Sequence, residues 1–179
     1  TQPIPSRPAP YAQQGLVEAD LIDYTPAIKD SALKLAQRIN GKWQTHVVDQ
    51  GTGALDGATG SIVGMYTSLT LRSDDGRPGI AYLAHVKDAK GVHAEVRFAS
   101  AQVPHPTAAG DWETWVVDSA PLPAADPANP DIFPLPAGLG LFVDSARMAD
   151  QSPVVAYYDR AHGQLKLARF GVQAGQFLA

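Results

Sequence analysis

A set of short strands that recurs along the chain constrains the fold more than any other feature of this sequence. Near the C-terminus, the apolar run Pro-Val-Val-Ala-Tyr-Tyr-Asp at residues 153–159 is followed by a polar turn and by Leu-Lys-Leu-Ala at residues 165–168. Short runs of this kind, rich in apolar residues and bounded by Gly, Pro and Asp, predict a β-hairpin. Self-similarity along a chain is typical of repeat architectures, so further copies of this hairpin would indicate one.

The same order of residues occurs in the middle of the chain and again near its start. The middle copy comprises residues 78–82, 94–99 and 111–118. Near the N-terminus, residues 33–36 are again Leu-Lys-Leu-Ala, the strand after them contains Trp43, and residues 21–24 are a degraded copy of 80–82. A further strand is expected before each Pro, at residues 66–71 and 142–146, so that the unit has four strands.

Four antiparallel strands repeated in this way predict an all-β fold made of β-propeller blades. We expect an extended N-terminal arm at 1–15, a partial blade at 16–60, a full blade at 61–120, and a loop with a nearly full blade at 121–179. A β-sandwich is the main alternative, and a fold with helices is a further one. Propellers need four to eight blades to close. We therefore expect an incomplete ring, completed by another polypeptide or by further copies of this chain.

The order of strands resembles the repeats of bacterial extracellular β-propeller proteins, and its layout is similar to that of sialidase-type and fungal fucose-lectin propellers. The resemblance covers residues 16–179 and implies a secreted, periplasmic or cell-surface location. It specifies fold better than activity, because this blade is used for many tasks. The sialidase Asp-box, Ser-x-Asp-x-Gly-x-Thr-Trp, is absent, since Ser73-Asp-Asp-Gly76 is shorter and lies in a different turn.

Composition excludes several classes of function. The net charge of −4 and the lack of Lys or Arg runs argue against a nucleic-acid partner. No stretch approaches the ~18 apolar residues of a membrane-spanning helix. The absence of Cys excludes disulfides, thiol nucleophiles and Cys-ligated zinc. We expect no cofactor and no metal site, because the five His residues lack the His-Glu-x-x-His spacing, and we expect His85 and His93 to be solvated near a turn.

Most of the aromatic and acidic residues that attract notice are periodic, which assigns them to the blade framework. Trp43 and Trp112 occupy one repeat position and are expected to pack between blades, and Tyr157 is expected in the core. Asp49, Asp118, Asp144 and Asp159 recur near strand ends, where carboxylates commonly accept hydrogen bonds from turn backbone. No catalytic residue is identified.

The residues that break the repeat are the candidates for binding. Trp115 has His46 at its equivalent position, Tyr158 alternates away from the core, and Asp144 is the least repetitive acidic residue. The candidate binding residues are Trp115, Asp144, Tyr158, Asp159 and His162. The long loop at 121–140, rich in Pro and Ala, breaks the repeat as well.

A structural or binding subunit of a secreted or cell-surface assembly is the function that the incomplete repeat favours over catalysis. Two alternatives stay open. Exposed aromatic residues suit a lectin-like carbohydrate-binding module. Strand-end carboxylates suit part of a propeller glycoside hydrolase or lyase, because glycoside hydrolysis requires a carboxylate pair.

Overall fold

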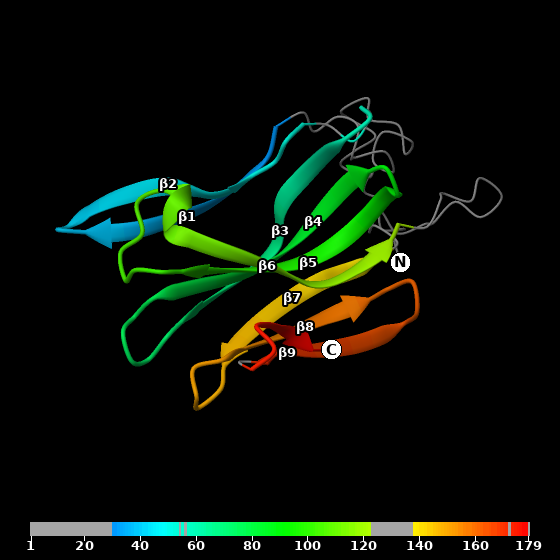
Figure 1. The fold of residues 1–179 in the computed structure, drawn as a ribbon. Coiled ribbons are helices and arrows are strands. Elements are labelled where there is room, and N and C mark those ends of the chain that lie inside the picture. The colour runs from blue at the N-terminus through cyan, green and yellow to red at the C-terminus, as the bar shows by residue number, and fades with distance from the viewer. Residues whose placement is uncertain (1–29, 54, 56, 123–137, 172, 179) are drawn as a thin grey trace, which may run out of the picture.

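The computed structural model describes residues 30–53, 55, 57–122, 138–171 and 173–178. These residues form an all-β structure of three antiparallel sheets with two, four and four strands, none of them closed (Figure 1). A short 3-10 turn, Ala109–Asp111, is the one helical element in the part of the chain described. The predicted arm at 1–15, the predicted strand at 21–24 and most of the loop at 121–140 lie outside the described residues.

The strands follow one another in space in the order of the sequence. The first sheet pairs β1 (Ala32–Ile39) with β2 (Lys42–Gln50). The middle sheet contains β3 (Gly60–Leu71), β4 (Pro78–Asp88), β5 (Gly91–Ala101) and β6 (Trp112–Pro121). The last sheet contains β7 (Leu139–Arg147), β8 (Pro153–Asp159), β9 (Gln164–Gly171) and β10 (Gln176–Leu178). Two of the three sheets therefore have the four antiparallel strands that the repeat predicts.

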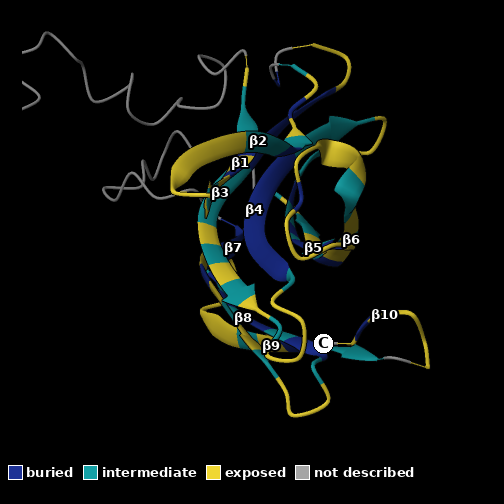
Figure 2. Cartoon of the chain, turned by 90° about the vertical axis from the view of Figure 1, so that its left-hand side faces the viewer, coloured by how far each residue is buried: buried dark blue, intermediate teal, exposed yellow. Residues whose placement is uncertain are grey.

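The middle sheet is covered on both faces, which explains its composition. In β4, Ala81 and Leu83 pack against the last sheet, whereas Ile80, Tyr82 and Ala84 pack against the first sheet. Figure 2 shows β4 buried along nearly its whole length between its neighbours. A strand buried on both faces is apolar at successive positions instead of alternating, and residues 80–84 have that pattern.

The two four-stranded sheets share an irregular first strand. Both β3 and β7 contain two register shifts against the next strand. Each has a Gly with positive φ, Gly64 (+88°) and Gly140 (+93°), followed two residues later by an aromatic residue with positive φ, Tyr66 (+49°) and Phe142 (+53°). Positive φ is uncommon for a bulky residue, so its recurrence at one position marks β3 and β7 as equivalent strands. The Tyr66 and Phe142 rings contact each other edge to face, with centroids 5.7 Å apart.

Candidate functional site

A group of three side chains joins the middle sheet to the last one. Asp118, near the end of β6, accepts hydrogen bonds from the Tyr157 hydroxyl at 2.8 Å and from Lys166 Nζ at 2.5 Å. The Tyr157 side chain is fully buried. Burial, together with the hydrogen bond to the Asp118 carboxylate, raises the pKa of Tyr157. The hydroxyl is therefore held protonated as a donor, and we name this group the inter-sheet clasp.

The same clasp joins the first sheet to the middle one. Asp49 accepts hydrogen bonds from the Tyr82 hydroxyl at 2.6 Å and from Arg97 Nη1 at 3.0 Å. The pKa of Tyr82 is raised, again by burial and by the hydrogen bond to Asp49. The sequence-based interpretation of Asp49 and Asp118 as turn caps is wrong. Both carboxylates act across sheets, although Asp118 also accepts a hydrogen bond from the Ser119 backbone.

Asp159, the last residue of β8, and His162, in the turn that follows, are two predicted binding residues that lie together. The Asp159 carboxylate is buried and lies 2.8 Å from His162 Nδ1, whereas the His162 side chain is 65% exposed. Burial would raise the pKa of Asp159, but hydrogen bonds from the His162 side chain and backbone outweigh it and lower that pKa. Lys166 Nζ is 3.9 Å from the same carboxylate, so the pair adjoins the inter-sheet clasp.

Asp144 lies elsewhere, on the strand that faces β3. Its carboxylate accepts hydrogen bonds from the Ser68 hydroxyl at 2.8 Å and from the Ser145 backbone. Ser145 also contacts Ser68 directly, with the two hydroxyl oxygens 3.2 Å apart. These bonds join the first strands of the two four-stranded sheets, and they give the exposed Asp144 a structural connection.

Trp115 and Tyr158 are both half-buried. The Trp115 ring meets Phe170 of β9 edge to face, with centroids 5.5 Å apart. Tyr158 packs against the edge of the core between the middle and last sheets. The five predicted binding residues are therefore not gathered in one place. Asp159 joins His162, while Trp115, Asp144 and Tyr158 are each in different surroundings.

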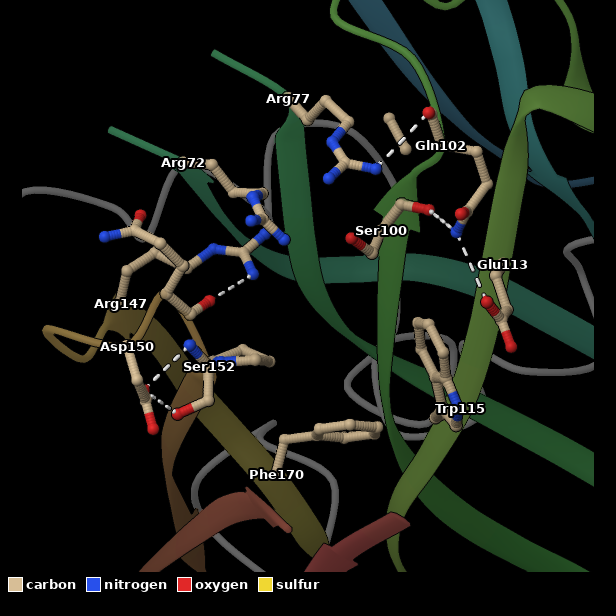
Figure 3. A pocket seen from close by; sticks show the side chains of 13 residues that line it. Arg72, Arg77, Ser100, Gln102, Glu113, Trp115, Arg147, Asp150, Ser152 and Phe170 are labelled. Atoms are coloured by element: carbon tan, nitrogen blue, oxygen red, sulfur yellow. Dashed lines mark hydrogen bonds between the residues drawn. The ribbon is translucent and has the colours of Figure 1, made fainter. Parts of the chain in front are cut away.

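Trp115 lines a cleft of about 360 Å³ between the middle and last sheets (Figure 3). Its other walls come from the β3–β4 turn, the end of β5, the β7–β8 turn and the end of β9. Three arginines from two of the sheets, Arg72, Arg77 and Arg147, line it as well. A hydrogen bond from the Ser73 backbone to Gln151 Oε1 joins the two turns at 2.9 Å.

The outer face of the last sheet is the other notable surface. Leu165 is 81% exposed and Leu167 64% exposed on β9. Their repeat equivalents are buried by the next sheet along the chain. In the first sheet these are Leu33 and Leu35, within Leu-Lys-Leu-Ala, and in the middle sheet they are Val96 and Phe98. We name this face of each sheet its trailing face.

We name the opposite face of each sheet its leading face; in the middle and last sheets it packs on the preceding sheet. Trp112 in the middle sheet packs there against the first sheet and donates its indole N–H to His46 Nε2 at 3.0 Å. Phe177 occupies the corresponding place in the last sheet and is buried. Trp43, at the same position in the first sheet, is 72% exposed. The prediction that both Trp43 and Trp112 pack between sheets holds for Trp112 and is wrong for Trp43.

His85 differs from its prediction too. It is buried on β4, and neither ring nitrogen has a hydrogen-bond partner among the described residues. Burial lowers the pKa of His85 to about 4. His93 lies one strand away, with Nε2 3.0 Å from Glu95 Oε1. The expectation that both histidines are solvated is therefore wrong.

Sequence reasoning missed the three arginines of the cleft and the exposed face of β9. Arg72 and Arg77 flank the turn at 73–76, and Arg147 ends the strand before the corresponding turn. An alignment of the two repeats would have placed these basic residues at equivalent turns, which was the available signal. The exposure of Leu165 and Leu167 carried no local signal, because the same motif is buried at 33–36.

The described part of the chain contains no group of three or more metal-ligating side chains close enough to hold an ion. Nor does it contain a helix of the length and apolarity needed to cross a membrane. Comparisons with protein-family models, with curated proteins and with solved structures found no match to this chain.

Proposed function

We propose that the three sheets are consecutive blades of a β-propeller, and that the chain is a structural subunit whose last blade is covered by the first blade of a second copy. The observation that carries the proposal is the exposure of Leu165 and Leu167. Their equivalents are buried by a following sheet in both places where the chain supplies one. Burying a Leu side chain stabilises by about 1.5–3 kcal/mol, so this face favours a partner.

A second copy offers a matching surface. The leading face of its first sheet presents Trp43, the equivalent of Trp112 and Phe177, which pack on the preceding sheet. The same face presents exposed Lys34, the equivalent of Lys166 in the identical Leu-Lys-Leu-Ala motif. Open faces that are complementary but different give head-to-tail contacts, which form rings or filaments. The first strands of the two complete sheets already contact each other, as the inner strands of a propeller would.

Disulfide trapping tests this arrangement cleanly, because the chain contains no Cys. Phe98 and Phe177 have ring centroids 5.7 Å apart across the boundary of the middle and last sheets. By repeat equivalence, Leu167 of one copy should contact Trp43 of the next. Mixing the Leu167→Cys and Trp43→Cys variants under mild oxidation should therefore give a covalent dimer linked through these two positions.

The matched control replaces Leu167→Cys by Val116→Cys. Val116 is also exposed, but it lies on the middle sheet. We expect little linkage between Val116→Cys and Trp43→Cys. Equal rates of linkage for the two mixtures would refute the head-to-tail contact.

The proposed location of the assembly, secreted or at the cell surface, rests on the resemblance of the repeat to extracellular propeller proteins. A hydrolase or lyase role gains no support from Asp144, whose carboxylate is engaged by Ser68 and the Ser145 backbone. The lectin-like alternative has one specific observation in its favour, the position of Trp115 in the cleft.

A further inference from the structure

We propose that the cleft between the middle and last sheets is a binding site for a sugar that carries a carboxylate group. The proposal does not depend on the stacking of further blades, because all of its residues come from the two sheets that are complete in this chain. Its parts are an arginine without a carboxylate partner among the described residues, free hydrogen-bond donors and an aromatic wall. Two carboxylates, Glu113 and Asp150, line the cleft as well.

Arg147 differs from the other two arginines of the cleft in its pairing. Arg72 pairs with Asp74 at 2.5 Å, and Arg77 pairs with Asp75 at 2.6 Å. Arg147 pairs with no carboxylate among the described residues. Its Nη1 donates to the Gln151 backbone carbonyl at 3.0 Å, while its Nε and Nη2 are buried without a partner in the described part of the chain. Burial and the charges of Arg72 and Arg77 lower the pKa of Arg147.

A guanidinium in this position is poorly stabilised by the protein alone. The Phe98 ring, whose centroid lies 5.3 Å from the Arg147 Cζ, favours the cation, as do the charges of Asp74 and Asp75, neither of which forms an ion pair with it. A buried charge without a counter-charge is costly. An anion in the cleft would supply that counter-charge for the arginine cluster.

Donors suited to an anion are also available. Arg72 uses Nε and Nη2 on Asp74, and Arg77 uses Nε on Asp75 and Nη1 on the Gln102 carbonyl. The remaining terminal nitrogens, Arg72 Nη1 and Arg77 Nη2, meet no acceptor among the residues that the structure describes. Guanidinium groups match carboxylates in geometry and form charge-assisted hydrogen bonds with them.

The aromatic wall favours a ring compound over a bare anion. Trp115 and Phe170 line the cleft, away from the Arg147 end, as Figure 3 shows. Gln102 and Glu113 lie beside Trp115 and are linked by a hydrogen bond of 3.2 Å, so a carbonyl and carboxylate oxygens are at hand for hydroxyl groups. The volume of about 360 Å³ lies within the range of about 300–1,000 Å³ typical of small-molecule sites.

Calorimetric titration of the chain with digalacturonic acid, and with the same disaccharide methyl-esterified on both carboxylates, tests the proposal. The acid should bind and the ester should bind at least about tenfold more weakly, because esterification removes the charge-assisted bonds. Arg147→Gln should weaken binding of the acid about tenfold, and Arg77→Gln should do the same without altering a buried group. Lys90→Gln, which removes an exposed charge from the β4–β5 turn at the other end of the sheet, should leave the affinity unchanged.

Circular dichroism establishes whether each variant is folded. If Arg147→Gln does not fold, the affinity of Arg77→Gln for the acid is the test of the arginine cluster. Three results would overturn the proposal. They are no binding of the acid, equal affinity for acid and ester, and displacement of the bound acid by inorganic sulfate present at the same concentration as the acid. The last result would mean a site for oxyanions in general and not for an acidic sugar.

Discussion

Removing the Asp118 carboxylate should weaken the contact between the middle and last sheets by a measurable and assignable amount. In Asp118→Ala, the Tyr157 hydroxyl loses its acceptor in a fully buried position, and Lys166 loses its closest ion-pair partner. A buried donor left without a partner costs about 1–3 kcal/mol, and a hydrogen bond to a charged group contributes about 1.5–3 kcal/mol. We therefore expect the free energy of unfolding to fall by about 2–4 kcal/mol.

A double-mutant cycle assigns the part that belongs to the clasp. Tyr157→Phe removes the hydroxyl together with its need for an acceptor, so the Asp118→Ala change should cost less in its presence. The expected coupling is about 1–2 kcal/mol, measured by urea unfolding of the four proteins. Tyr158→Phe is the matched control. The Tyr158 hydroxyl has no acceptor in the described part of the chain, so the effect of Tyr158→Phe on the unfolding free energy should add to that of Asp118→Ala.

The equivalent cycle with Asp49 and Tyr82 should give coupling of similar size, because the two groups have the same geometry. Additive effects at both boundaries, within about 0.3–0.5 kcal/mol, would refute the claim that the clasp is a repeated element that holds the sheets together.

Three further predictions concern the fold. As pH falls from 6.5 to 4, His85 should lower the unfolding free energy of the wild type by about 3 kcal/mol, because the unfolded chain binds the proton first. His85→Leu should remove this loss. An unchanged dependence of stability on pH in the variant would contradict the prediction. Gly140→Ala should destabilise the protein by about 2–4 kcal/mol in thermal unfolding, because a Cβ at this position would lie 2.8 Å from the Leu83 side chain. Gly91→Ala is the control and should cost less, because Gly91 has a similar φ but a Cβ there would have no atom within 4 Å. Trp112→Phe should cost about 0.5–1.5 kcal/mol by urea unfolding through loss of its bond to His46, and no change would argue against that bond.

The sequence predicted the strands well because hydrophobic pattern and turn residues are local. The strands at 78–82, 94–99 and 153–159 fall inside β4, β5 and β8, and the four-strand order is present twice. Periodicity also placed Tyr157 correctly in the core. Whether the sheets form a propeller stays a prediction, because the sheets described here are not closed.

The candidate site was harder to predict because its residues meet only through packing between sheets. Arg72 and Arg147 stand far apart in the chain and come together because two equivalent turns lie at the same end of adjacent sheets. The roles of Asp49 and Asp118 depend on tyrosines of the following sheet, which no local pattern reveals. Leu33 and Leu165 have identical local sequence and opposite exposure, so only the arrangement of whole sheets distinguishes them.

The mass of the chain in solution, measured by sedimentation over a range of concentrations, tests the central claim most directly. If the trailing face of the last sheet binds the leading face of a second copy, the wild type should reach multiples of 18.9 kDa as concentration rises. The variant with both Leu165→Asp and Leu167→Asp should stay at the single-chain mass. A wild type that remains at 18.9 kDa at every concentration would contradict the account.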